Sequence, residues 1–168
     1  MNCIVNVSKN WGIGNGGNLL VHLSEDLRMF RETTQGCAVI LGRKTLATFP
    51  GGRPLKNRRN IVLTRSDTPI EGAELCHSIS DALRLAAEIE KDTPCWVIGG
   101  AQVYRQLLPY CELALVTKTE IDAEADSYFP NLDEDPLWEL TDSPEEKEEN
   151  GVRFRFLTYR NRAPLPPV

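Results

Sequence analysis

The fold is indicated most directly by the stretch Val97-Ile98-Gly99-Gly100-Ala101-Gln102-Val103-Tyr104. A short apolar run ends in two glycines, and a helical pattern follows at once, with Val103 and Leu107 one turn apart. Continuous apolar runs are typical of strands that are buried on both faces of a parallel sheet. The glycines would let a phosphate or ribose group approach the backbone closely, although a tight strand-to-helix turn explains them equally well.

The same alternation of apolar runs and helical patterns extends outward from this stretch. We expect strands at Asn2–Val7, Cys37–Leu41, Asn60–Thr64 and Cys95–Ile98. We expect helices at Ser24–Thr34, Arg43–Phe49, Ser80–Lys91 and Ala101–Leu108. Ser78 with Asp81 three residues later is a start signal for the third helix. The sequence therefore predicts an α/β fold with a mixed, mostly parallel central sheet and helices on both faces.

The pattern changes after Pro109, where strands are expected at Glu112–Thr119, Leu137–Thr141 and Val152–Tyr159. Asn150-Gly151 supplies turn residues, so we predict a C-terminal antiparallel hairpin at one edge of the sheet. The acidic stretch from Glu145 to Asn150 is interpreted as a solvated loop, rather than as a binding tail for a basic partner. We expect a single domain over residues 1–160 and an extended tail over residues 161–168.

Composition excludes several classes of protein. The 168 residues suit one domain, and 41% hydrophobic with 26% charged residues argues against a disordered chain. The formal charge of −5 argues against nucleic acid as the main partner. The five cysteines have no spacing typical of a disulfide framework or metal site, and no run is long enough for a membrane span. We therefore expect a cytoplasmic protein with reduced cysteines and no metal, membrane or nucleic-acid partner. We also expect a monomer.

The first glycine-rich segment, Gly12 to Gly17, contains the pattern G-x-G-x-x-G after a strand. In a dinucleotide-binding fingerprint the helix begins at once, whereas here residues 18–23 intervene before Ser24, the expected N-cap. The next strand also ends in Gly42-Arg43 rather than in an acidic residue. We therefore predict a long flexible loop, and propose that it is a mobile lid.

One carboxylate, Asp26, falls within the apolar face of the first predicted helix. That face contains Leu23, Leu27, Met29, Phe30 and Thr34. A carboxylate there must either interact with the first turn of the helix, have a polar partner, or face a cavity where a ligand satisfies it. The pattern alone leaves these three possibilities open.

Basic residues follow two strands that are expected to be neighbours. Gly42-Arg43-Lys44-Thr45 ends the second strand and Thr64-Arg65 ends the third, so both would face one crevice. Arg43, Lys44 and Arg65 would then bind a phosphate, although exposed basic residues are more often simply solvated.

Taken in order, these segments resemble the dihydrofolate reductase family over nearly the whole chain. The matching segments are Asn2–Val5, Trp11–Gly14, Asp26–Phe30, Val39–Thr45, Arg58–Leu63, Val97–Ala101, Val103-Tyr104 and Asp126–Pro130. The resemblance implies reduction of 7,8-dihydrofolate to tetrahydrofolate by hydride transfer from NADPH, and binding of antifolate inhibitors. The alternatives are a riboflavin-biosynthesis-type NADPH reductase of the same fold and a non-catalytic nucleotide-binding module.

The resemblance also implies roles for individual residues. Asp26 matches the active-site carboxylate, Thr117 the threonine that supports it, and Arg58 the arginine that binds the substrate's α-carboxylate. The implied substrate-binding residues are Ile4, Val5, Asn6, Leu19, Val21, Leu27, Phe30, Phe49, Leu55, Arg58, Ile98 and Tyr104. The implied NADPH-binding residues are Asn6, Ile13, Gly14, Leu19, Gly42, Arg43, Lys44, Thr45, Leu63, Thr64, Arg65, Ile98, Gly99, Gly100, Ala101, Gln102, Val103 and Tyr104.

Two sites depart from the family pattern. Where many members have Leu-Pro-Trp, this chain reads Leu19-Leu20-Val21, so the tryptophan that often fixes a water near the pterin is absent. Asn6 stands where the family often has alanine, next to the pterin, and its amide is expected to alter the affinity for substrate or antifolates.

Overall fold

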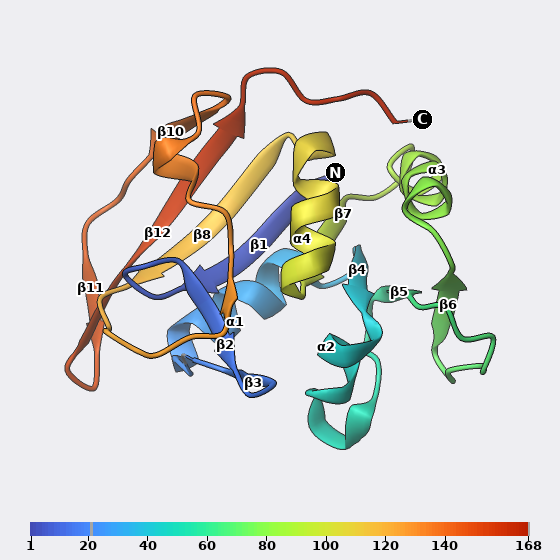
Figure 1. Ribbon diagram of the computed structural model, residues 1–168, viewed down its shortest axis with the longest axis horizontal. Helices are drawn as coiled ribbons and strands as arrows, with labels where there is room; N and C mark the ends of the chain where they lie inside the picture. The colour runs from blue at the N-terminus through green and yellow to red at the C-terminus, as the bar shows by residue number, and fades with distance from the viewer. Residues whose placement is uncertain (21, 168) are drawn as a thin grey trace.

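A nine-stranded sheet runs through the computed structural model, which describes residues 1–20 and 22–167 (Figure 1). Its strands, in spatial order, are β10 (Trp138–Asp142), β12 (Val152–Asn161), β8 (Leu113–Thr119), β1 (Asn2–Val7), β7 (Cys95–Gly99), β4 (Ala38–Gly42), β5 (Arg59–Leu63) and β6 (Ala73–Cys76), with β11 (Lys147–Glu149) beside β12. Strands β8 to β6 are parallel, and β10, β11 and β12 are antiparallel to their neighbours. The predicted fold is confirmed.

Helices cover both faces of this sheet. Helices α1 (Ser24–Thr34) and α2 (Arg43–Ala47) pack against a cluster that includes Ile4, whereas α3 (Ile79–Ile89) and α4 (Ala101–Leu107) contribute to a cluster that includes Cys3 and Val5. Figure 1 shows α4 lying across β1 and β7. Because side chains alternate along a strand, Asn6 shares the α1 face with Ile4.

Most predicted elements lie within two residues of the observed ones, and the differences have local causes. The predicted helix at Arg43–Phe49 ends at Ala47, because Phe49 precedes a proline and is extended (ψ 155°). A short 3₁₀ turn, η1 (Pro50–Gly52), follows, and two more form η2 (Leu108–Tyr110) and η3 (Leu132–Glu134). Strand β6 was not predicted from the sequence.

The glycine-rich N-terminal segment is not an irregular loop, so that prediction was wrong. It contains β2 (Gly12–Asn15) and β3 (Asn18–Leu19), which form a small sheet with β9 (Ser127–Tyr128). The Gly16 N–H donates to Asp126 Oδ2 at 2.8 Å, and Asn15 Nδ2 donates to the Glu124 carbonyl at 2.8 Å. Because these partners lie over one hundred residues away, the segment itself carried no signal of the sheet. Its mobility stays a prediction.

The acidic stretch is also not simply a solvated loop, because Lys147–Glu149 forms β11 and pairs with β12. Asn150 (φ 51°) and Gly151 (φ 81°) connect the two strands, as predicted for this hairpin. In the same stretch, Glu146 forms an ion pair with Arg153 at 3.6 Å. Charged side chains of this segment therefore form contacts within the fold.

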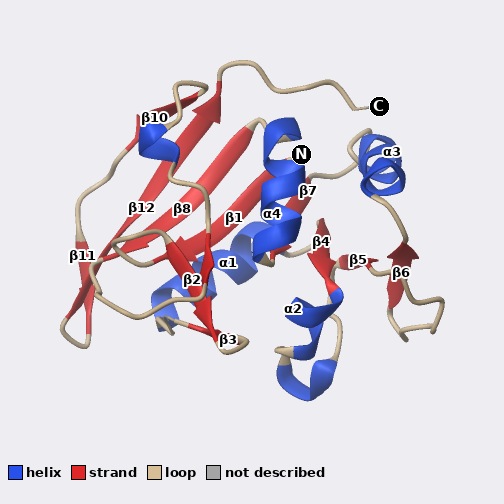
Figure 2. Cartoon of the chain, in the orientation of Figure 1, coloured by secondary structure: helices blue, strands red, loops and turns tan. Residues whose placement is uncertain are grey.

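The C-terminal tail begins one residue later than predicted, because β12 continues through the buried Asn161. Asn161 Nδ2 donates to the Cys111 carbonyl at 3.0 Å, which holds this residue in the fold. Figure 2 shows the tail running from the end of β12 towards α3. Along this path the Leu165 N–H donates to the carbonyl of Pro109, in η2, at 3.0 Å.

Candidate active site

The Asp26 carboxylate lies between α1 and the sheet, with a protein donor on each oxygen. Thr117 Oγ1 donates to Asp26 Oδ1 at 2.5 Å, and Asn6 Nδ2 donates to Asp26 Oδ2 at 2.9 Å. Asn6 of β1 and Thr117 of β8 are register partners in adjacent parallel strands, so the sheet holds both donors side by side. Of the three possibilities left by the sequence, Asp26 therefore has polar partners, and each oxygen keeps room for a further hydrogen bond.

Burial dominates the ionisation of this carboxyl group. It raises the pKa of Asp26 above its ordinary value, while the hydrogen bonds from Thr117 and Asn6 offset part of that rise. The negative charge of Glu149 raises the pKa further. A carboxyl group with a raised pKa retains a proton to a higher pH, and such groups concentrate at active sites.

A third polar residue, Thr119, extends this network. Thr119 Oγ1 donates to Asn6 Oδ1 at 2.9 Å, which fixes the orientation in which the Asn6 amide donates to Asp26. Sequence reasoning missed Thr119. The available signal was the period of two along β8, which places Thr117 and Thr119 on the same face as Leu115.

The start of α1 also differs from the prediction. Ser24 is not the N-cap: Leu23 occupies that position and makes no side-chain cap. Instead, Glu149 of β11 accepts hydrogen bonds from the Ser24 N–H at 2.7 Å and the Glu25 N–H at 2.9 Å. No sequence pattern indicated this contact, because Glu149 lies within a run of charged residues.

An apolar wall adjoins Asp26 on the same face of the sheet. Five of the predicted substrate-binding residues belong to one cluster: Ile4, Phe30, Phe49, Leu55 and Ile98. Leu27 is not brought into this cluster and remains 51% exposed. The Val5 side chain lies in the core on the opposite face, and Tyr104 is buried there while its hydroxyl donates to the Ile4 carbonyl at 2.7 Å.

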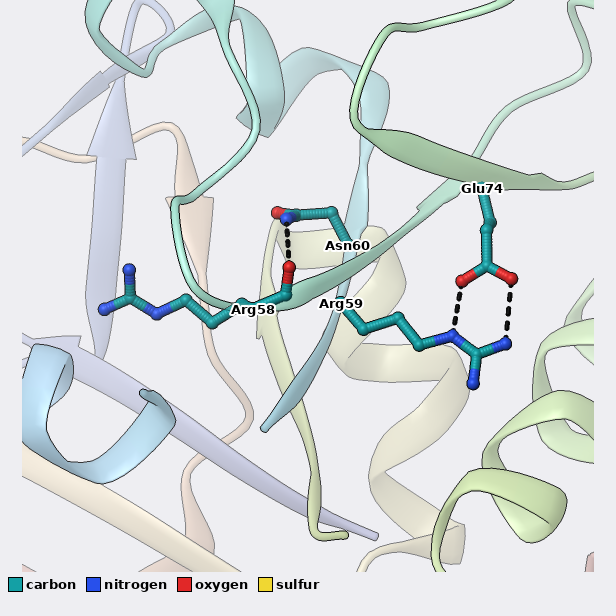
Figure 3. A network of polar contacts seen from close by, with 4 residues as sticks. All are labelled: Arg58, Arg59, Asn60 and Glu74. Atoms are coloured by element: carbon teal, nitrogen blue, oxygen red, sulfur yellow. Dashed lines mark hydrogen bonds and ion pairs between the residues drawn. The ribbon is translucent and has the colours of Figure 1, made fainter. Parts of the chain in front are cut away.

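Arg58 lies at the other end of this wall, and Figure 3 shows its side chain pointing away from that of Arg59. Arg58 Nε donates to Thr34 Oγ1 at 3.1 Å, and Nη1 donates to the Lys56 carbonyl at 2.8 Å. Arg59 instead forms an ion pair with Glu74 of β6. Partial burial and the nearby Arg31 lower the pKa of Arg58, which has no ion pair with the described residues. This arginine is therefore available to an anionic ligand.

A glycine-lined cradle lies where α2 and α4 begin. A Cβ atom at Gly42 would lie 3.2 Å from Val103 Cγ2, and one at Gly100 would lie 3.1 Å from Thr45 Oγ1. Gly99 has a φ of 133°, which favours glycine. The structure thus brings together the two predicted phosphate-binding segments, with a backbone surface that larger side chains would fill. A pyrophosphate-bearing cofactor fits this surface.

The remaining predicted cofactor residues surround this cradle or lie beyond it. Arg43, Lys44, Arg65 and Gln102 are exposed, and no ion pair joins these three cations to the described residues. The other predicted residues, Ile13, Gly14, Leu63, Thr64 and Ala101, are partly buried. The side chain of Leu19 and all of Val21 lie outside the described residues. Within the described chain, no cluster of three or more His, Cys, Asp or Glu residues has the geometry of a metal site.

Comparison with known proteins identifies the family. The sequence model described as "Dihydrofolate reductase" matches residues 1–161. The chain belongs to the dihydrofolate reductase family. It is 38% identical over 153 residues to the dihydrofolate reductase of Bacillus subtilis (strain 168), covering 89% of this chain and 88% of that protein. It is 36% identical over 182 residues to the dihydrofolate reductase of Rattus norvegicus, covering 96% of this chain and 97% of the relative.

A solved dihydrofolate reductase has the same fold. The structure from Enterococcus faecalis, complexed with NADP(H) and RAB-propyl, superposes with a TM-score of 0.82 at 31% identity, covering 95% of each chain. The resemblance seen in the sequence is therefore confirmed, and the chain is an enzyme of the dihydrofolate reductase family. Among the described residues, the helices are all too short or too polar to cross a membrane.

Proposed function

We propose that the protein reduces 7,8-dihydrofolate to 5,6,7,8-tetrahydrofolate with NADPH, by hydride transfer, in one-carbon and thymidylate metabolism. The observation that carries this proposal is the Asp26 carboxyl group, which is partly buried beside an apolar wall and has a raised pKa. The family membership and the relative complexed with NADP(H) support the cofactor. Antifolates are expected to bind at the same place.

Asp26 is the proposed catalytic residue. Its oxygens accept hydrogen bonds from the amidine edge of the pterin, in addition to those from Thr117 and Asn6. A carboxylate in a poorly hydrated pocket orients the ring and favours protonation of the nitrogen next to the carbon that receives hydride. Thr117 keeps the carboxylate in the orientation that this role requires.

The rest of the substrate is held by two features of the chain. Phe30, Phe49, Leu55 and Ile98 provide apolar contacts, and the exposed Leu27 is free to add another. Arg58 binds the α-carboxylate of the glutamate tail, because its planar guanidinium group matches a carboxylate with two hydrogen bonds. The pterin and the tail are thereby fixed at opposite ends of the site.

NADPH, when bound, supplies the hydride. Gly99, Gly100 and Thr45 would hold its pyrophosphate, because the absence of side chains at the glycines leaves the backbone accessible. Arg43, Lys44 and Arg65 would bind its phosphate groups, with Arg65 near the adenosine 2′-phosphate. Ile13 and Ile98 would contact the nicotinamide.

A steady-state assay tests this function. NADPH absorbance should fall only when dihydrofolate is also present, and Asp26→Asn should lose most activity near neutral pH. A pre-protonated substrate at lower pH should restore part of that activity, because it no longer depends on Asp26 for its proton. Unchanged rates in Asp26→Asn would exclude the mechanism.

The same assay separates the alternatives. Turnover of a ribosylamino-pyrimidine but not of dihydrofolate would indicate the riboflavin-type reductase, and NADPH binding without turnover would indicate a non-catalytic module. We also propose a cytoplasmic monomer with a single domain over residues 1–161 and a C-terminal tail from residue 162. Sedimentation in solution tests the oligomeric state.

A further inference from the structure

We propose that Glu149, on the C-terminal hairpin, is a positioning residue for Asp26, because it holds the first turn of α1 and adds a negative charge on that side of the site. The role of Asp26 itself rests on the proposed function. The contacts of Glu149 do not depend on that function, so the two can be tested separately.

The geometry joins two distant parts of the chain. Glu149 Oε2 accepts the Ser24 N–H at 2.7 Å and Oε1 accepts the Glu25 N–H at 2.9 Å, so one carboxylate binds two free amides of the first turn. Lys147, on the same strand, forms an ion pair with Glu25 at 3.1 Å. Three contacts from β11 therefore fix the turn that carries Asp26.

This arrangement replaces an ordinary helix cap. The N-cap residue, Leu23, has no side-chain oxygen, so the first-turn amides need a hydrogen-bond acceptor from elsewhere in the fold. Strand β11 itself is held by its pairing with β12, in which Glu149 is the register partner of Val152. Since β12 also pairs with β8, the hairpin that anchors α1 is continuous with the strand that carries Thr117.

The charge of Glu149 has a second effect on Asp26. The partial positive charge at a helix N-terminus favours the ionised form of a nearby carboxyl group. The Glu149 carboxylate binds two free amides at this helix N-terminus and so opposes that influence. Its negative charge raises the pKa of Asp26. The two backbone donors lower the pKa of Glu149 itself, so Glu149 keeps its negative charge to a lower pH than an ordinary glutamate.

Other charged groups around Asp26 have different partners or directions. On α1, Glu25 is paired with Lys147, while Arg28 and Arg31 line a surface hollow with Ser24, Glu25 and Glu149. On β8, Lys118 lies on the opposite face, with its Nζ 4.3 Å from the centre of the Trp11 ring and 3.8 Å from Asp133. Beyond Glu149 on the hairpin, Glu148 is exposed, and Arg153 and Arg155 face Glu146. On β1, the polar neighbour is the uncharged Asn6.

The test uses two substitutions with the same change in charge, one residue apart. In the ligand-free protein at low salt, the Asp26 carboxyl carbon is titrated by ¹³C NMR in the wild type, Glu149→Gln and Glu148→Gln. We expect Glu149→Gln to lower the pKa of Asp26, because the charge is lost while a glutamine oxygen can still accept one amide. Glu148→Gln should leave that titration unchanged, because no polar contact joins the Glu148 side chain to the described residues.

A wild-type measurement covers the case in which Glu149→Gln fails to fold. Raising the salt concentration screens charges in contact with solvent, so it should lower the pKa of Asp26 in the wild-type protein. An unchanged titration in folded Glu149→Gln, an equal shift in Glu148→Gln, or no response to salt in the wild type would each overturn the inference.

The kinetic consequence distinguishes positioning from general support of the fold. If activity falls as the pH rises because Asp26 loses its proton, that fall should occur at a lower pH in Glu149→Gln than in Glu148→Gln. A uniform loss of activity at every pH would mean only structural support and would overturn the proposed role. A wild-type protein that does not reduce dihydrofolate would exclude the proposed function, yet leave the NMR result intact.

Discussion

At the scale of single residues, the pair formed by Asn6 and Asp26 is the centre of the polar network of the site. The sequence indicated that Asn6 departs from the family pattern, but not what its amide would contact. The structure gives it a defined role, because Asn6 Nδ2 donates to Asp26 Oδ2 while Thr119 holds the amide oxygen. An alanine at this position would leave that carboxylate oxygen with one donor fewer.

Asn6→Ala is therefore expected to raise the pKa of Asp26 further, because the lost hydrogen bond favours the ionised carboxylate. The titration of the Asp26 carboxyl carbon by NMR measures this change. Thr119→Val keeps the amide and removes only its anchor, so we expect a smaller shift in the same direction. An Asp26 titration that is identical in Asn6→Ala and the wild type would contradict the role of Asn6.

Asp26 should also impose a cost on folding that depends on pH. Burial raises its pKa in the folded state, so folding favours the protonated carboxyl group over the ionised one. The stability of the folded state is therefore unaffected below the unfolded pKa of about 3.9 and is progressively reduced as the pH rises through the folded pKa. The unfolding free energy of the wild type minus that of Asp26→Asn should therefore decrease with rising pH. Urea denaturation at several pH values measures this difference, and parallel curves for the two proteins would contradict the expectation.

At the scale of elements, the two long helices begin in different ways. Helix α3 has the local cap predicted from its sequence, in which Ser78 Oγ accepts the Asp81 N–H at 3.1 Å. Helix α1 has a serine at a similar place in the sequence but takes its cap from Glu149. The cap of α3 is thus encoded within one turn of chain, and that of α1 depends on residues over one hundred positions away.

Ser78→Ala should lower the free energy of unfolding by about 1 kcal/mol, the usual contribution of a side-chain N-cap. Urea denaturation measures the loss, and the rate of dihydrofolate reduction should be unchanged because Ser78 is not among the proposed site residues. Ser80→Ala is the matched control, since Ser80 is exposed on the same helix and is not its N-cap. Equal stability of Ser78→Ala and Ser80→Ala would show that the cap contributes nothing.

At the scale of the whole molecule, the net charge of −5 opposes the binding of two anionic ligands. The proposed cofactor-binding segments must therefore attract these ligands with a local positive charge. The parallel pairing of β4 with β5 brings Arg43 and Lys44 to the same edge of the sheet as Thr64-Arg65. The fold thus gathers cations that are more than twenty residues apart in the sequence.

Arg65→Ala should weaken the preference for NADPH over NADH by about tenfold or more, because a hydrogen bond between charged groups contributes roughly 1.5–3 kcal/mol. The ratio of kcat/KM for the two cofactors measures the preference. Arg162→Ala removes the same charge from the exposed C-terminal segment and should leave that ratio unchanged. Equal kcat/KM values for both cofactors in the wild type would contradict the role given to Arg65.

Much of the fold was predictable because its signals are local. The apolar runs of β1, β4, β5 and β7 and the periodicity of α1 and α3 depend on neighbouring residues, and their predicted boundaries were close to those observed. The small sheet of β2, β3 and β9 was missed because its strands are short and pair across most of the chain. The roles of individual site residues stay predictions, although the structure does join Asp26 to Thr117.

The sequence by itself determined the fold class, the family and the presence of one carboxylate on an apolar helix face. Those properties follow from periodicity and from the order of short motifs. Only the tertiary structure decided the partners of that carboxylate: Asn6 and Thr117 from adjacent parallel strands, and Glu149 at the start of its helix. The physical reason is that burial and hydrogen bonding depend on distances between side chains, which strand pairing and helix packing set and which spacing along the chain does not.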